Sequence, residues 1–119
     1  LAVTISGMAL GIDQWWAEAC IELDIPFTAV VPFDGFHIRW PKESQDRFNS
    51  ILKEAEAIVY VCPPGYEAWK MQKRNEWMVD YCTELVAYWD GSPGGTNNCL
   101  IYALAKKKPH SIFHPGMIQ

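Results

Sequence analysis

The alternation of short apolar runs with helical stripes constrains the fold of this chain most strongly. Four stretches carry apolar residues at helical spacing, and they separate five short runs that are rich in Val and Ile. These runs lack strict polar alternation, which is typical of strands covered on both faces. The order predicts an α/β fold with a mainly parallel sheet and helices on both faces. The predicted strands are Leu1–Ser6, Phe27–Val31, Ile58–Cys62, Leu85–Trp89 and Ser111–Phe113, and the predicted helices are Ile12–Leu23, Lys42–Ala57, Glu67–Thr83 and Asn97–Lys107.

Composition narrows the class of protein. A chain of 119 residues fits one domain, 1–119. Its net charge of −4 argues against a general nucleic-acid binder, which is usually basic. No apolar run is long enough to cross a membrane. The cysteines are widely spaced and form no C-x-x-C pair, so we expect reduced thiols in a cytoplasmic protein, no metal site and no required cofactor. They are Cys20, Cys62, Cys82 and Cys99.

Two glycine-containing turns are the strongest candidates for a ligand site. The first spans Ser6–Asp13 and the second spans Asp90–Thr96, and each lies between a predicted strand and a predicted helix. Because parallel strands end at one edge of a sheet, both turns are expected at that edge, where backbone N–H groups and helix N-termini attract phosphate. Thr96 is also a good N-cap. The predicted ligand-binding residues of the turns are Ser6, Gly7, Met8, Gly11, Gly94, Gly95, Thr96 and Asn97.

Polar side chains near these turns have two interpretations each. Asp13 either complements the dipole of its helix or accepts a hydrogen bond from a ribose hydroxyl. Arg74 either belongs to a solvated basic face or binds a phosphate, since arginine recognises phosphate with two parallel N–H groups, and Asn75 suits a base edge or a ribose.

Two aromatic residues and one cysteine have the same ambiguity. Tyr66 and Trp69 follow a predicted strand end, where they either stack on a nucleobase or pack beneath a loop. Cys99 lies in the first turn of a helix, where a thiol pKa can fall, but no basic partner lies nearby in the sequence.

Long motifs resemble the SLOG superfamily of Rossmann-like nucleotide-binding domains. SGMALGID resembles a segment of the DNA-processing protein A family, and KRNEWMVDYCTELVAYWDGSPGGTNN resembles a block of the Lonely Guy and lysine-decarboxylase-like proteins. An uncharacterised bacterial and phage SLOG group is the most similar. Its blocks match SGMALGIDQW, IPFTAVVPFDG, RWPKESQDRF, IVYVCPPGYEAWKMQKRNEWMVD and WDGSPGGTNN, which cover nearly the whole chain.

The resemblance implies a Rossmann-like three-layer sandwich and a nucleotide-type ligand, and it also marks two departures. Family members begin with a further strand and helix that have no counterpart here, so the resemblance implies a domain that lacks this first unit. Lonely Guy enzymes cleave nucleoside monophosphates with an Arg and a Glu. Arg74 matches that Arg and Glu76 matches an upstream Glu, whereas Asn97 and Asn98 replace the later carboxylate. Asparagine is neither a general acid nor a base.

Three functions follow, in order of preference. The first is a sensor or binding module for an ADP-ribose-like molecule or a nucleoside monophosphate. The second is a phosphoribohydrolase that uses Arg74 and Glu76. The third is single-stranded DNA binding through Lys70, Lys73, Arg74 and Trp69, which the acidic charge disfavours. The resemblance also implies a homodimer, because superfamily members often pair through a helical face.

Overall fold

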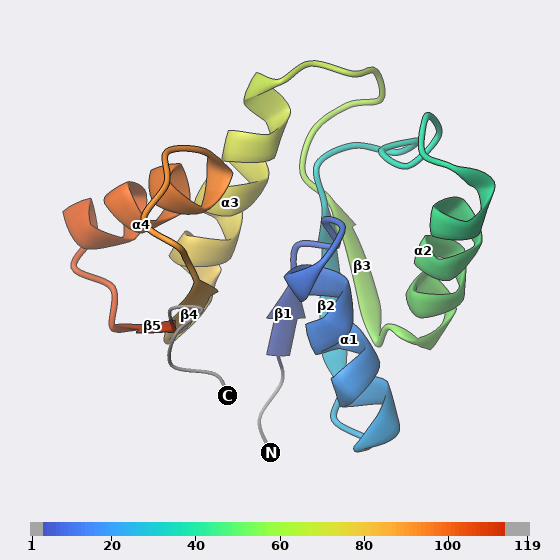
Figure 1. The fold of residues 1–119 in the computed structure, drawn as a ribbon, viewed down its shortest axis with the longest axis horizontal. Helices are drawn as coiled ribbons and strands as arrows, with labels where there is room; N and C mark the ends of the chain where they lie inside the picture. The colour runs from blue at the N-terminus through green and yellow to red at the C-terminus, as the bar shows by residue number, and fades with distance from the viewer. Residues whose placement is uncertain (1–3, 114–119) are drawn as a thin grey trace.

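A computed structural model describes residues 4–113 and has alternating strands and helices (Figure 1). The strands are β1 (Thr4–Ser6), β2 (Phe27–Val31), β3 (Ala57–Tyr60), β4 (Leu85–Tyr88) and β5 (His110–Phe113). The helices are α1 (Ile12–Glu22), α2 (Lys42–Glu54), α3 (Trp69–Tyr81) and α4 (Gly95–Ala105). All nine predicted elements are confirmed in type, and the Rossmann-like α/β fold is confirmed. The first part of the first predicted strand, Leu1–Val3, lies outside the described residues.

Element boundaries shift where backbone geometry overrides periodicity. The second helix was predicted to reach Ala57, but Ala55 is already extended (φ −69°, ψ 139°) and Ala57 opens β3. The fourth helix begins two residues before its predicted start, because Gly94 is the N-cap with φ 142°. Only glycine adopts that conformation readily. The prediction that Thr96 is the N-cap was therefore wrong, and Thr96 lies inside the first turn of the helix.

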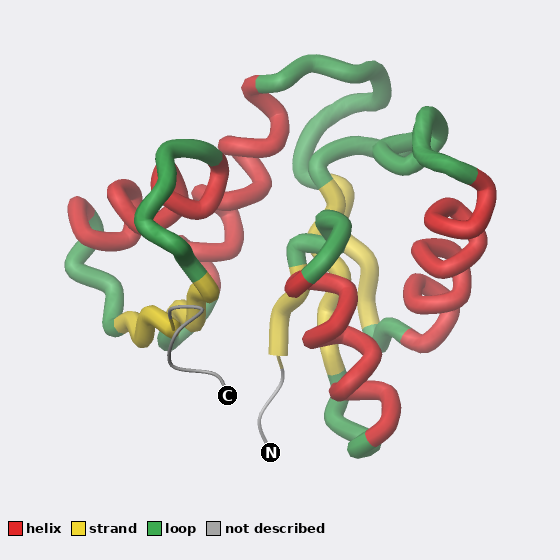
Figure 2. Tube along the Cα trace, in the orientation of Figure 1, coloured by secondary structure: helices red, strands yellow, loops and turns green. Residues whose placement is uncertain are grey.

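The strands form two parallel sheets rather than the single sheet that was predicted. One sheet has the order β1-β2-β3 and the other pairs β4 with β5 (Figure 2). Each sheet has its own core. Phe27, Ala29, Phe48 and Ile51 contribute to the first, between the three-stranded sheet, α1 and α2, whereas Val79 and Ala103 contribute to the second, between α3 and α4. Sequence periodicity identifies extended segments but leaves their pairing to tertiary contacts, so it missed this division.

Among residues 4–113, no strand pairs with the outer edge of β1 or with the edge of β4 opposite β5. The Leu85 N–H donates to the carbonyl of Pro109, directly before β5, and the Trp89 N–H donates to the Phe113 carbonyl, at 2.9 Å each. Val86 and Tyr88 therefore direct their N–H groups to the other edge of β4. All four residues of β4 line a cavity at that edge. The N–H groups of Val86 and Tyr88 have no hydrogen-bond partner within residues 4–113.

This open edge predicts an alternating pattern of amide hydrogen exchange along β4. We expect Val86 and Tyr88 to exchange about tenfold or more faster than Leu85 and Trp89, because only the latter two donate within the sheet. Exchange measured by NMR on the whole chain resolves these four amides. Equal protection of Val86 and Leu85 would show that β4 is paired on both edges.

No helix among the described residues is long and apolar enough to span a membrane.

Candidate functional site

The first glycine turn is closed by its own side chains. The Ser6 hydroxyl donates to the Asp13 carbonyl at 2.7 Å and accepts from the Met8 N–H at 3.3 Å. The Ala9 N–H donates to Asp13 Oδ2, also at 3.3 Å. Met8 has a φ of 62° and is fully buried. Asp13 therefore holds the turn together, in addition to any role toward a ligand, and the Met8 N–H is not available to a phosphate.

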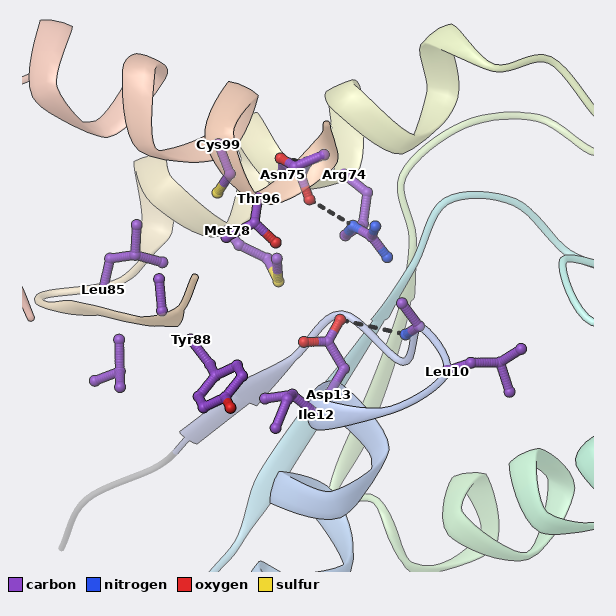
Figure 3. Close-up of a pocket in the computed structure, with 14 residues that line it drawn as sticks. Leu10, Ile12, Asp13, Arg74, Asn75, Met78, Leu85, Tyr88, Thr96 and Cys99 are labelled. Carbon is purple, nitrogen blue, oxygen red and sulfur yellow. Dashed lines mark hydrogen bonds between the residues drawn. The ribbon is translucent and has the colours of Figure 1, made fainter. Parts of the chain in front are cut away.

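Arg74 connects this turn to α3 and is buried. Its Nη1 donates to the Gly7 carbonyl. Its Nε donates to Asn75 Oδ1 at 2.9 Å, a bond drawn as a dashed line in Figure 3. Asn75 Nδ2 in turn donates to the Gly95 carbonyl at 3.4 Å. Two neighbouring residues of one helix thus hold both glycine turns. The interpretation of Arg74 as part of a solvated basic face was wrong, because its side chain is buried, as is that of Asn75.

Gly7 lies where three side chains meet. A Cβ atom there would be 2.9 Å from Asp13 Oδ2 and 3.1 Å from both Arg74 Nη1 and Met78 Cε. The absence of a side chain at this position therefore allows Asp13 and Arg74 to approach the turn.

A cavity of about 390 Å³ is lined by the β1–α1 turn, the start of α1, α3, the whole of β4 and the start of α4. It brings together Asp13, Arg74, Asn75, Gly95 and Thr96, all of which were predicted as site residues. Figure 3 shows Asp13 facing the cavity below Thr96 and Met78. Apart from Cys99, which was considered as a reactive thiol, the sequence did not single out the rest of the lining, because most of these residues are apolar and lack a chemical signature. They are Ala9, Leu10, Ile12, Met78, Leu85, Val86, Ala87, Tyr88 and Cys99.

A second cavity of about 270 Å³ adjoins the first at the start of α4. The two share Tyr88, Gly95 and Thr96, and the second adds Gly94 and Asn97 of the predicted set. The Asn98 N–H makes the first helical bond of α4, to the Gly94 carbonyl at 2.9 Å. The N–H groups of Gly95, Thr96 and Asn97 precede it, so they lack partners within the helix and are suited to an anion.

Several predicted residues lie outside both cavities. Ser6, Gly7 and Met8 do not line the first cavity, but they precede Ala9 and Leu10, which do. Gly11 is the N-cap of α1. Tyr66 and Trp69 are 60% and 51% exposed and line neither cavity. Their stacking on a nucleobase stays a prediction.

Apart from Arg74, the residues proposed for catalysis and DNA binding line neither cavity. Glu76 lines neither cavity and pairs with Lys73 at 3.6 Å. Lys70 is buried, and its Nζ donates to the carbonyls of Pro63 and Gly65 at 2.7 Å each. Lys70 thus fixes the loop after β3 instead of presenting a free cation.

Burial is the main cause of the pKa shifts of the two charged side chains that line the cavity, Asp13 and Arg74. It raises the pKa of the Asp13 carboxyl, an effect that the charge of Arg74 partly opposes. Burial lowers the pKa of Arg74, which nearby Asp13 partly offsets. Arginine remains protonated at any physiological pH, so the cavity holds a fixed positive charge.

Cys99 does not have the reactive character that its helix position suggested. Burial raises the pKa of its thiol to about 11. The thiol is therefore protonated at neutral pH, when it is a poor nucleophile. Among residues 4–113, no group of three His, Cys, Asp or Glu side chains is placed to hold a metal ion.

The raised pKa of Asp13 predicts a specific pH dependence of stability. Between 3.8, the ordinary pKa, and the raised value, the folded state binds more protons than the unfolded state. The contribution of Asp13 is thus fully present below pH 3.8 and is lost as pH rises through the folded pKa. The difference in the free energy of unfolding between the wild type and Asp13→Asn, taken as wild type minus variant, should fall as pH rises. The slope of this difference against pH should correspond to the release of at most about one proton. Urea titrations at stepped pH test this, and a difference that rises with pH would contradict it.

The comparisons with known proteins agree with this architecture. The YspA SLOG family matches residues 1–118. The uncharacterized SPbeta prophage-derived protein YoqJ of Bacillus subtilis is 32% identical, over 93% of this chain and 75% of that protein. UPF0398 proteins of Brevibacillus brevis and Staphylococcus haemolyticus are 27% and 28% identical, over 93% and 79% of this chain. The chain spans 62% and 53% of their lengths.

A solved structure shares the fold. The putative molybdenum carrier protein from Syntrophus aciditrophicus superposes with a TM-score of 0.69 at 21% identity. The match covers all of this chain and 66% of that one.

Proposed function

Because this chain belongs to the YspA SLOG family, we propose that it is a binding module for a nucleotide or nucleotide-derived ligand, of the ADP-ribose or nucleoside monophosphate type. One observation carries the proposal. Buried Arg74 lines the first cavity, and the first turn of α4 lines both this cavity and the one that adjoins it. A fixed cation and free helical N–H groups are the two common elements of phosphate recognition. Asp13 adds an acceptor for a ribose hydroxyl.

The shape of the site supports a ligand with more than one part. The cavities of about 390 and 270 Å³ meet at Gly95 and Thr96, so a phosphate there would leave space on both sides. Asp13 and the apolar residues of β4 line one side, and Trp89 with Pro93 lines the other. For a ligand of the ADP-ribose type, which carries a ribose on each side of its diphosphate, we expect one ribose beside Asp13 and the other, with its planar base, near Trp89.

Neither alternative function gains support from the position of its key residues. A phosphoribohydrolase would need Glu76 near the ligand, and this carboxylate lies outside the cavities and pairs with Lys73. Single-stranded DNA binding would need Lys70 and Lys73 to be available, and both are already engaged. We also propose a cytoplasmic location, since the four cysteines are free thiols.

Thermal unfolding in the presence of candidate ligands tests the proposal. The panel contains AMP, ADP, NAD, ADP-ribose, cyclic ADP-ribose, a short single-stranded DNA, inorganic phosphate and molybdate. A nucleotide at about a hundred times its Kd should stabilise the chain by roughly 2.7 kcal/mol, which is a shift of several degrees. If only molybdate or inorganic phosphate stabilised the chain, the ligand would be a simple oxyanion and not a nucleotide.

Two threonine variants locate the site. Thr96→Glu places a negative charge at the start of α4 and should abolish the shift, because it repels phosphate from both cavities. Thr83→Glu makes the same change at an exposed position outside both cavities and should preserve the shift. Loss of the shift in both variants, or in neither, would contradict the proposed site. Release of free base from AMP that disappears in Glu76→Gln would favour the hydrolase instead.

A further inference from the structure

The larger cavity is bordered by the edge of β4 as well as by its side chains. Leu85, Val86, Ala87 and Tyr88 all line this cavity. Successive side chains of a strand point to opposite faces of its sheet, so a cavity that borders four residues in a row lies along the edge of the strand. This is the edge opposite β5, with which no strand pairs among residues 4–113. The cavity therefore gives a ligand access to backbone groups that a neighbouring strand would otherwise cover.

Val86 presents a hydrogen-bond donor and an acceptor at this edge. The N–H and the carbonyl of one extended residue point to the same side of its strand. The Leu85 N–H donates to the Pro109 carbonyl, so Leu85 faces β5 and Val86 faces the cavity. Val86 is 50% exposed, which leaves room for a ligand group beside it. A backbone group that loses water on binding needs a new partner, so the best match is a ligand group that brings both an acceptor and a donor.

Val86 also lies one sugar length from the position proposed for the phosphate. The two cavities share Tyr88, Gly95 and Thr96, beside which the phosphate would bind. Val86 precedes Tyr88 by two residues, which is roughly 7 Å along the strand. It lines the larger cavity and not the smaller one. A ribose beside Asp13 would span this interval, so the group on its anomeric carbon would reach Val86.

The surroundings of Val86 suit a planar ring. Asp13 and Arg74 are the two charged side chains in the described lining of the cavity, and β4 contributes no charge to it. In Figure 3 Met78 lies above Tyr88 and Ile12, which belong to the same lining. Apolar walls with a few well-placed polar groups are typical of sites for small organic ligands. The polar groups that β4 adds to these walls belong to its backbone.

We propose that Val86 binds an amide-type edge, meaning a hydrogen-bond acceptor beside an N–H donor, on the group that this ribose carries. The Val86 N–H donates to the acceptor, and the Val86 carbonyl accepts from the donor. Two nucleotide groups have such an edge. One is the carboxamide of nicotinamide in NAD, and the other is N1 with the N6 amine of adenine in AMP. This inference rests on the proposed nucleotide-binding function and adds the part of the ligand that β4 recognises.

Amide hydrogen exchange measured by NMR on the whole chain tests the contact. Saturating AMP or NAD should slow the exchange of Val86 about tenfold or more, and the amides of Leu85 and Trp89, which already have partners, should change less. If adenine is the group, N6,N6-dimethyl-AMP, which lacks the donor, should lose the effect of AMP. If nicotinamide is the group, NAD should slow Val86 and AMP should not. Nicotinic acid adenine dinucleotide, which has a carboxylate in place of the carboxamide, should then also have no effect.

The outcomes separate this contact from the binding function itself. A thermal shift with AMP or NAD, without slower exchange of Val86, would overturn the contact and leave the binding module standing. Equal slowing by AMP and N6,N6-dimethyl-AMP would also overturn it. Slow exchange of Val86 before any ligand is added would show that another segment already pairs with this edge, which is incompatible with the proposal. No thermal shift with any nucleotide would reject both the function and the contact.

A pair of proline variants tests the contact from the side of the protein. Val86→Pro removes the N–H that faces the cavity and keeps the hydrogen bonds to β5, since proline is tolerated at an unpaired strand edge. It should weaken binding of the effective nucleotide about fivefold or more and leave that of its analogue without the amide-type edge unchanged. Ile112→Pro is the control. Its N–H faces away from β4, because the carbonyls of Pro109 and Phe113 face toward it, and Ile112 lines neither cavity. Equal loss for both nucleotides in Val86→Pro, with its circular dichroism unchanged, would overturn the contact.

Discussion

Gly7→Ala is expected to destabilise the chain by about 1–3 kcal/mol and to weaken nucleotide binding at least tenfold. The new Cβ would lie 2.9 Å from Asp13 Oδ2 and 3.1 Å from both Arg74 Nη1 and Met78 Cε. These three neighbours belong to α1 and α3, which are packed against their own cores, so the side chains have little room to move together. The Asp13 carboxylate must shift, Arg74 and Met78 must give by a few tenths of an ångström, and all three line the cavity. Urea unfolding and ligand-induced thermal shifts measure the two effects.

Gly95→Ala is the matched control for this substitution. Gly95 also lines the cavity, but a Cβ atom added there would meet nothing within 4 Å apart from its chain neighbours and the backbone of its own helix. Its φ is compatible with alanine, which is also the better helix former. We expect unchanged or slightly increased stability. A wild-type unfolding midpoint for Gly7→Ala would show that the first turn adapts more freely than these distances imply.

Arg74→Met is expected to cost about 2–4 kcal/mol of unfolding free energy and to abolish binding of phosphate-containing ligands. Methionine retains much of the side chain's length but removes the bonds to the Gly7 carbonyl and Asn75 Oδ1. It also removes the positive charge that opposes the raised pKa of buried Asp13. The loss of stability should therefore grow as pH rises and Asp13 ionises. Urea titrations at stepped pH measure it.

Two further variants make this result interpretable. Arg47→Met removes the partner of Glu18 at the surface and should cost less than about 1 kcal/mol. Adding Asp13→Asn to Arg74→Met should recover part of the stability at neutral pH, because no carboxylate is then left without its cation. Additive losses in the double variant would show that Asp13 and Arg74 are not coupled.

The sequence predicted the helices and strands well because their signals are local. The apolar runs around Phe27–Val31 and Leu85–Tyr88 and the stripe containing Phe48 and Ile51 each identify their element without knowledge of the rest of the chain. The predicted single sheet was wrong because strand pairing depends on contacts between distant segments. No property of a strand alone shows whether a neighbouring strand pairs with each of its edges.

The candidate site was predicted in part for the same reason. Gly94, Gly95 and Thr96 carry a local signature, since a glycine-rich turn before a helix exposes N–H groups wherever it occurs. Arg74 had two interpretations, and burial decided between them. Leu10 and Ile12 could not have been singled out, because an apolar residue at a cavity rim looks like any other in a sequence.

The sequence by itself determined which segments are helical or extended, which turns need glycine, and which family the motifs resemble. Only the tertiary structure decided that the strands divide into two sheets, that Arg74 and Asn75 hold both turns, and that Glu76 and Lys70 face elsewhere. The physical reason is the distance along the chain over which each interaction acts. Backbone preference and periodicity act over a few residues. Burial, charge pairing and long-range hydrogen bonds join distant segments, as the bond from Arg74 to the Gly7 carbonyl does across 67 residues.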